Sequence, residues 1–155
     1  MGLPGDIDTW IDKLAINELI AQYSDAVTRG DWDAFEAVWA PDGVWQETPP
    51  IETEVVGARA IREQVAASLD AADLYVQMVH EVVITVLGDG RASARTHLQG
   101  IAKHGEHDFV NYGIYYDELV KIDGIWKFTR RRLQHIYVET SPLVGQVAIS
   151  RSALP

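Results

Sequence analysis

The run Val76-Gln77-Met78-Val79-His80-Glu81-Val82-Val83-Ile84-Thr85-Val86, which ends at the turn Gly88-Asp89-Gly90, decides the class of fold. Its many β-branched residues favour an extended strand. Three further strand candidates follow at about 91–102, 108–120 and 125–138, and the connections between them are short and turn-like. Strands joined by such turns are typical of an antiparallel meander.

Helices are predicted in the part of the chain before this meander. Apolar residues recur at helical spacing at five positions: Ile16, Leu19, Ile20, Tyr23 and Val27. This pattern predicts a long helix that begins near Asp8-Thr9 and ends at Gly30. A short helix is expected over about 31–39, and a third from Ala58 to about Leu69.

The segment between the second and third helices is predicted to be irregular. Ala40-Pro41-Asp42-Gly43 has proline and glycine in positions typical of a turn, and a short strand from Val44 to Glu47 follows it. Pro49-Pro50 then interrupts any regular element. The predicted class is α+β, with three helices from the N-terminal half packed on a curved, mostly antiparallel sheet.

Composition limits the classes of protein to which the chain can belong. Its 155 residues, 47% of them hydrophobic, suit one domain spanning residues 1–155. The formal net charge of −10 opposes nucleic-acid binding, because such binding depends on Lys and Arg at phosphates. No apolar run is long enough to predict a membrane span, and no signal-peptide pattern occurs, so we expect a cytoplasmic protein.

His80 is the first candidate for chemistry. The even positions from 76 to 86 read Val, Met, His, Val, Ile and Val, and a strand places alternate side chains on one face. His80 is therefore expected to point towards the core, where an imidazole needs a hydrogen-bond partner. Histidine is suited to acid/base work near neutral pH. By itself, however, the pattern favours a core histidine whose hydrogen bonds are satisfied.

Several stretches resemble one known family. Four segments resemble SnoaL-like proteins of the nuclear-transport-factor-2-like superfamily. They are the run from Leu14 to Asp25, the segments Gly30-Asp31-Trp32 and Trp39-Ala40-Pro41-Asp42-Gly43, and the final hairpin from Tyr116 to Phe128. The similarity is greatest to the branch with scytalone dehydratase, bile-acid 7α-dehydratase and hexachlorocyclohexane dehydrochlorinase. The resemblance implies a cone-shaped α+β barrel with a small-molecule pocket at its open end. The fold alone implies no particular activity.

The same resemblance implies a catalytic pair. His80 falls where the eliminating enzymes of this branch carry their histidine base, and Asp25 matches the aspartate that pairs with it in the dehydrochlorinase. A carboxylate that accepts from one imidazole nitrogen raises the basicity of the other. The helical wheel places Asp25 opposite the main apolar stripe, which would make it a solvated residue. A weaker strip of Ile11, Leu14 and Ala21 on its side favours a helix covered on both faces.

Other side chains are candidates for lining the pocket. They are Tyr23, Trp45, His97, Asn111, Tyr115 and His135. Tyr23 and His97 match pocket residues of the bile-acid enzyme and of scytalone dehydratase, respectively, although Tyr23 also belongs to an apolar stripe and His97 could face outward. His135 departs from the bile-acid enzyme, which has an arginine there, and this puts carboxylate anchoring in doubt. His104 and His107 flank a turn and are expected to be exposed rather than to bind a metal.

The expected function is cofactor-independent acid/base catalysis on a small, largely apolar hydroxylated ring or a polyketide- or steroid-like substrate. A dehydratase is the first choice, and an isomerase or cyclase would use the same base. A non-catalytic ligand-binding module, an epoxide hydrolase with an Asp–Arg–Asp set and a small dioxygenase subunit are the alternatives. Neither a metal nor a cofactor is expected, and the resemblance implies a homo-oligomer, either dimer or trimer.

Overall fold

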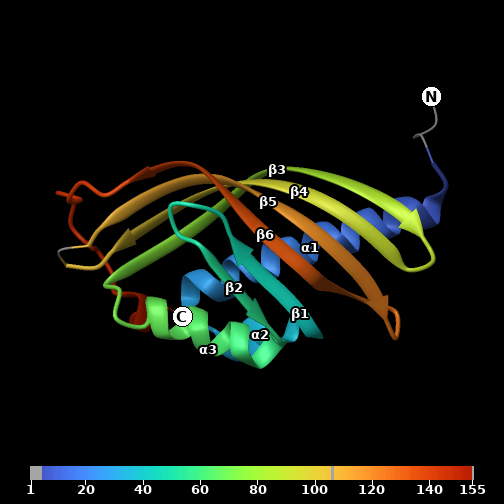
Figure 1. The fold of residues 1–155 in the computed structure, drawn as a ribbon, viewed down its shortest axis with the longest axis horizontal. Coiled ribbons are helices and arrows are strands. Elements are labelled where there is room, and N and C mark those ends of the chain that lie inside the picture. Colours follow the sequence, from blue (N-terminus) through green and yellow to red (C-terminus); the bar gives the residue numbers. More distant parts are fainter. Residues whose placement is uncertain (1–4, 106, 155) are drawn as a thin grey trace.

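The computed structural model describes residues 5–105 and 107–154, in which a curved sheet arches over three helices (Figure 1). The helices are α1 (Ile7–Arg29), α2 (Trp32–Ala37) and α3 (Ala58–Leu69), with a short 3-10 helix, η1 (Arg151–Ala153), near the C-terminus. The strands are β1 (Trp39–Glu47), β2 (Thr53–Val56), β3 (Leu74–Gly88), β4 (Arg91–Lys103), β5 (Phe109–Ile122) and β6 (Ile125–Glu139). The predicted α+β class is confirmed.

The sheet is open and mixed. Its strand order is β2-β1-β6-β5-β4-β3, so β2 and β3 form its edges. The meander from β3 to β6 is antiparallel, whereas β1 pairs with β6 in parallel. The parallel pair brings the end of β1 beside a strand that lies more than eighty residues later in the sequence, with Glu47 opposite Leu133.

Helix α1 follows the predicted apolar stripe. Asp6 caps its first turn by accepting a hydrogen bond from the Thr9 amide at 2.7 Å, and Gly30 ends it in the left-handed conformation, with φ of 73°. All five residues of the stripe are buried, and the helix packs mainly against β3. The helix therefore presents one face to the core and leaves the opposite face to solvent.

The segment after α2 differs from its prediction. Residues 40–43 belong to β1 instead of a turn, and the pairing with β6 shifts register between Trp39 and Val44. Gly43 permits this irregular passage, because a Cβ there would lie 2.9 Å from the Trp39 ring and 3.1 Å from the Ala40 carbonyl oxygen. Strand β2 has no counterpart in the prediction; it forms only by pairing with β1.

A β-bulge in β3 reverses the face on which its side chains lie. The pairing with β4 moves from Val79 opposite Leu98 to Val82 opposite Thr96, so His80 and Glu81 together lie opposite His97. Odd-numbered residues such as Gln77 face the core before the bulge, and even-numbered ones face it afterwards. His80 is exposed on the outer face. The prediction that it points towards the core is therefore wrong.

One ion pair lies inside the aromatic core. The Arg131 guanidinium donates from Nε to Asp117 Oδ1 at 2.9 Å and from Nη2 to Oδ2 at 3.2 Å, and both side chains are 0% exposed. The Arg131 guanidinium carbon lies 4.2, 3.9 and 4.4 Å from the ring centres of Tyr23, Tyr115 and Phe128. Burial raises the pKa of Asp117 to about 6, although Arg131 opposes this shift.

Arg151 ties the C-terminal segment to two helices. Its guanidinium donates to the carbonyl oxygens of Val27 at 2.6 Å and Thr28 at 3.0 Å, both near the end of α1, and to that of Leu69 at 3.0 Å, at the end of α3. These carbonyls have no partner within their own helices, and a cation at a helix C-terminus is favourable. One buried side chain thus caps two helices.

We expect Arg151→Met to lower the free energy of unfolding by about 2–4 kcal/mol, because buried hydrogen bonds from a charged donor are lost and the Val27 and Thr28 carbonyls lose this partner. Urea unfolding followed by circular dichroism measures the change. Arg59→Met, at an exposed position of α3, is the matched control and should change the value by less than about 0.5 kcal/mol. Equal losses in the two variants would show that Arg151 does not cap the helices.

None of the helices in the described part of the chain is long and apolar enough to cross a membrane.

Candidate functional site

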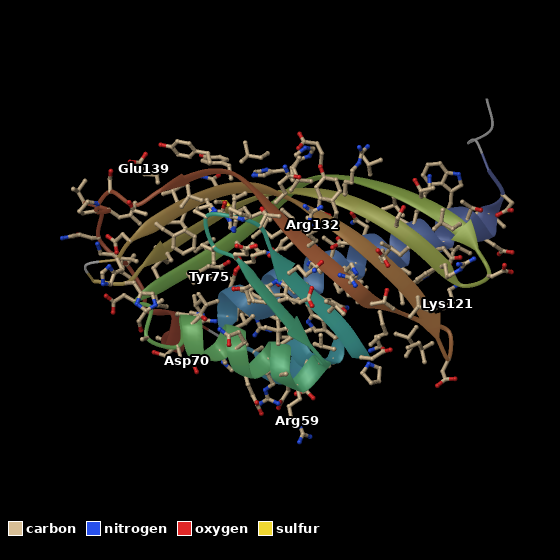
Figure 2. All side chains as sticks on the ribbon, viewed as in Figure 1. Arg59, Asp70, Tyr75, Lys121, Arg132 and Glu139 are labelled. Carbon is tan, nitrogen blue, oxygen red and sulfur yellow. The ribbon has the colours of Figure 1, made fainter. Side chains whose placement is uncertain are left out.

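A cavity of about 220 Å³ lies between the concave face of the sheet and the helices. Figure 2 shows the side chains between the sheet and the helices, with Tyr75 labelled. The apolar part of the wall includes Val27, Ile51, Val65, Leu69, Leu98, Phe109 and Leu133. The polar part includes Glu47, Gln77, Asn111 and His135, together with Tyr23, Tyr75 and Tyr115.

Glu47, His135 and Asn111 form a chain of polar groups in the wall. His135 Nε2 lies 3.6 Å from Glu47 Oε1, and its Nδ1 lies 3.1 Å from Asn111 Oδ1. The parallel pairing of β1 with β6 creates this contact, and Thr48 holds the two strands together by donating to the Leu133 carbonyl at 3.0 Å. The side chain of His135 is 2% exposed and that of Glu47 is 13% exposed. The carboxylate is therefore the member of the pair that solvent reaches.

This geometry determines where a proton lies. The Asn111 oxygen can only accept, so His135 Nδ1 carries a hydrogen. His135 Nε2 then faces the Glu47 carboxylate, and neither atom has a hydrogen in the neutral imidazole and ionised carboxylate forms. A proton on either partner replaces this unfavourable contact with an attractive one. The geometry thus places a carboxylate and an imidazole nitrogen side by side at the cavity.

Tyrosine hydroxyls lie in another part of the wall. Tyr75 donates to Gln77 Oε1 at 3.1 Å, and the Tyr115 hydroxyl lies 3.5 Å from the same oxygen. Burial raises the pKa of Tyr75 and of Tyr115. Burial also raises the pKa of Tyr23, while Arg131 and a hydrogen bond from Tyr115 oppose the shift. All three hydroxyls stay protonated at neutral pH, and those of Tyr75 and Tyr115 already donate to Gln77.

Arg131 lies behind this tyrosine group rather than in the cavity. Its guanidinium stacks on the rings of Tyr23 and Tyr115 and is fully buried. A fixed positive charge behind a phenol stabilises negative charge that develops at its oxygen or at a group bonded to it. The site therefore has a carboxylate–imidazole pair and separate hydroxyl donors backed by a cation.

The structure places five of the predicted pocket residues around this one cavity, namely Tyr23, Trp45, Asn111, Tyr115 and His135. Their role in binding a substrate stays a prediction. The sequence analysis missed Glu47, Tyr75 and Gln77. Glu47 had a detectable signal, because it has the same strand parity as Trp45. Gln77 had none, because the bulge in β3 reverses the parity of its strand.

The other predicted site residues lie elsewhere. Asp25 is 62% exposed and forms an ion pair with Arg29 at 2.9 Å, as the helical wheel indicated. His97 is 49% exposed, with its Nδ1 3.8 Å from a carboxylate oxygen of Glu81. Neither residue lines the cavity, and nor does the exposed His80. The structure thus gives no support to an Asp25–His80 pair inside the cone.

The predicted exposure of the turn histidines is met only in part. His104 contributes to the rim of the cavity, and its Nε2 lies 3.1 Å from the Ser68 carbonyl oxygen in α3. His107 is exposed. Within residues 5–105 and 107–154, no group of three or more His, Asp and Glu side chains is placed to hold a metal ion.

A curved, open sheet that covers helices around a small internal cavity is typical of the nuclear-transport-factor-2-like class of α+β proteins. The family model of the SnoaL-like domain matches residues 8–132. The chain belongs to this family. The resemblance predicted from the sequence is therefore confirmed.

Solved structures share the fold. A candidate scytalone dehydratase from Novosphingobium aromaticivorans is 20% identical over 90% of this chain and 97% of its own, with a TM-score of 0.77. Hexachlorocyclohexane dehydrochlorinase LinA-type3 from Novosphingobium barchaimii LL02 is 16% identical over 92% and 97%, with a TM-score of 0.77. Rv3472 from Mycobacterium tuberculosis, a protein of unknown function, is 23% identical over 98% and 89%, with a TM-score of 0.75. Comparison with curated proteins gives no significant match.

Proposed function

We propose that this protein is an enzyme that moves a proton on a small, largely apolar molecule held in the cavity. The observation that carries the proposal is the contact between Glu47 and His135, with His135 held by Asn111 on its other side. Buried carboxylate–imidazole pairs are suited to general acid/base catalysis. The dehydratase-type and dehydrochlorinase-type names of proteins with this fold are compatible with such chemistry.

In this proposal Glu47 removes the proton, because its carboxylate is the more exposed member of the pair. His135 is a positioning residue that orients the carboxylate and shares the proton with it. In an elimination, the C–H electron pair forms the new double bond, the C–O bond breaks, and the proton leaves with the hydroxide as water. Elimination of water is our first choice; an isomerase would return the proton to another carbon, and a cyclase would use the carbanion to form a ring.

The tyrosines complete the proposed mechanism. Removal of a proton beside a carbonyl places negative charge on the carbonyl oxygen, and a neutral phenol can donate a hydrogen bond to it. Tyr23 fits this role, because it lines the cavity and its raised pKa keeps the phenol protonated. Arg131 behind the ring supports the charge that develops.

The cavity volume narrows the substrate. A cavity of about 150 Å³ binds a single benzene ring, whereas pockets for drug-sized ligands start at about 300 Å³. The volume here, about 220 Å³, lies between these values. One or two fused rings fit the site better than the four rings of a steroid.

The test uses a neutral probe of bases in apolar sites, 5-nitrobenzisoxazole. Removal of its C3 proton breaks the N–O bond and releases a coloured phenolate. We expect the wild-type protein to accelerate this reaction over buffer and Glu47→Gln to lower kcat by about 100-fold, the usual contribution of a general base. Absorbance measures the rate.

Glu52→Gln is the matched control, since it removes the same charge at an exposed position outside the cavity wall. Its rate should equal that of the wild type. If Glu47→Gln and Glu52→Gln react alike, Glu47 is not the base. If the wild type fails to accelerate the reaction at all while small rings still bind, a non-catalytic ligand-binding module is the better description.

A further inference from the structure

The cavity wall has an acidic side chain but no Lys or Arg among the described residues. The acidic side chain is the carboxylate of Glu47. The guanidinium of Arg131 is near but is 0% exposed, and the rings of Tyr23 and Tyr115 separate it from the open space. An anion that entered would lose its hydration and meet a carboxylate without finding a Lys or Arg side chain.

Away from Glu47 and His135, the wall offers two hydrogen-bond donors. Trp45 lines the cavity, and its buried Nε1 has no hydrogen-bond partner in the described part of the chain. An indole nitrogen only donates, and a buried donor that lacks a partner is costly. The hydroxyl of Tyr23 is a second donor in the same wall. A ligand that brings an uncharged acceptor oxygen satisfies these groups.

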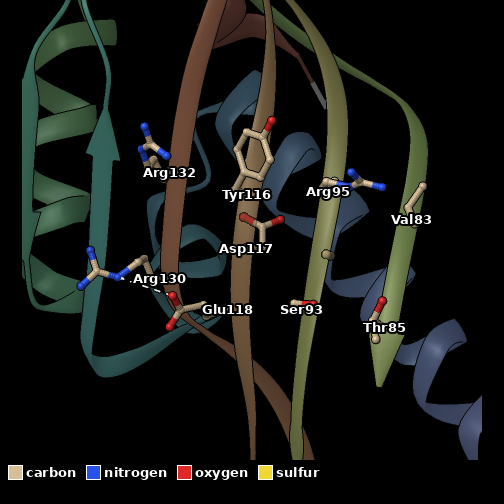
Figure 3. A pocket seen from close by; sticks show the side chains of 10 residues that line it. Val83, Thr85, Ser93, Arg95, Tyr116, Asp117, Glu118, Arg130 and Arg132 are labelled. Atoms are coloured by element: carbon tan, nitrogen blue, oxygen red, sulfur yellow. Dashed lines mark ion pairs between the residues drawn. The ribbon is translucent and has the colours of Figure 1, made fainter. Parts of the chain in front are cut away.

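Three arginines lie on the other side of the sheet. A shallow hollow of about 410 Å³ on the outer face is lined by Arg95, Arg130 and Arg132 (Figure 3). Their guanidinium groups do not converge: Arg95 extends towards β3, whereas the other two extend towards β1. Arg130 also pairs with Glu118 at 3.9 Å. The hollow is therefore no substitute anchor for an acidic substrate in the cavity.

From these observations we infer that the cavity selects an uncharged molecule of one or two rings with a carbonyl oxygen, and that it rejects carboxylates of the same shape. The inference rests on the proposed function only in taking this cavity as the substrate site. The Glu47 carboxylate has two effects in this cavity. It removes a proton from a C–H bond of a neutral ligand, and it repels an anionic ligand.

The experiment compares three ligands of one shape with the full chain at neutral pH, by isothermal titration calorimetry. They are 1-indanone, indane-1-carboxylate and indane. We expect the ketone to bind at least about 100-fold more tightly than the carboxylate, because like charges a few ångströms apart repel strongly at low dielectric. The ketone should also bind more tightly than indane, which has no acceptor.

Glu47→Gln removes the repelling charge and should narrow the gap between ketone and carboxylate by about tenfold or more. Glu52→Gln should leave the gap unchanged. Equal binding of the ketone and the carboxylate by the wild type overturns the inference, as does the absence of binding by the ketone. Glu47→Gln binding that matches the wild type for all three ligands overturns it as well.

The two proposals fail separately. The benzisoxazole reaction uses an uncharged probe, so Glu47 can prove to be the base even if carboxylates bind well. Conversely, the ketone can be strongly preferred while Glu47→Gln does not slow the benzisoxazole reaction. In that case the inferred ligand class is supported and Glu47 is not the base.

Discussion

Replacing Asp117 with alanine is expected to lower the free energy of unfolding by about 3–5 kcal/mol, the usual cost of removing one member of a buried ion pair. The guanidinium of Arg131 would then lose both of its carboxylate hydrogen bonds while it stays fully buried. The aromatic rings stacked on it cannot replace a negative charge. Chemical unfolding of the purified variant at neutral pH measures the loss.

A double variant separates the cost of an unpaired charge from the cost of lost packing. Asp117→Leu combined with Arg131→Met removes both charges and keeps apolar volume, and such replacements are often neutral or stabilising by about 1–4 kcal/mol. We expect the double variant to unfold at a higher urea concentration than Asp117→Ala. It also gives a result if the single variant fails to fold. A loss below about 1 kcal/mol in the single variant would show that the pair is not coupled.

Replacing Tyr23 with phenylalanine is expected to slow enolisation in the cavity by about 100- to 1,000-fold, the usual effect of removing one donor from a site that stabilises an oxyanion. The readout is exchange of the α-hydrogens of 1-indanone for deuterium, followed by NMR. The affinity for 1-indanone should fall less than about tenfold, because the charge that Tyr23 stabilises develops only after binding.

Tyr75→Phe is the matched control for this prediction. Its hydroxyl is buried in the same wall but is already engaged with Gln77 at 3.1 Å. Its removal should slow exchange less than about tenfold. If the two variants slow exchange equally, Tyr23 is a packing residue like its neighbour and the proposed donor role is wrong.

Local periodicity in the sequence was enough to predict most elements of this fold. The apolar stripe of α1 is buried as its spacing indicates, and α3 runs from Ala58 to Leu69 as predicted. In β6 the alternation predicts only that Arg131 and Arg132 face opposite sides; a register shift at Thr129 decides that Arg131 is the inner one. The helical wheel alone places Asp25 on the solvent face, where the structure has it, whereas the family resemblance led to the expectation that Asp25 lies in the pocket. The helical features depend on residues within one or two turns of each other, so the sequence contains them directly.

The tertiary structure determined which polar residues form the site. The bulge at His80 and Glu81 depends on pairing with β4, and it moves the histidine outward and Gln77 inward. The contact between Glu47 and His135 depends on a parallel pair of strands that are distant in sequence. Neither leaves a periodic signal, because hydrogen bonding between strands sets register and a single inserted residue reverses every side chain beyond it. The sequence by itself determined the helices, the meander and the family, whereas only the long-range pairing of strands determined which polar side chains face the cavity.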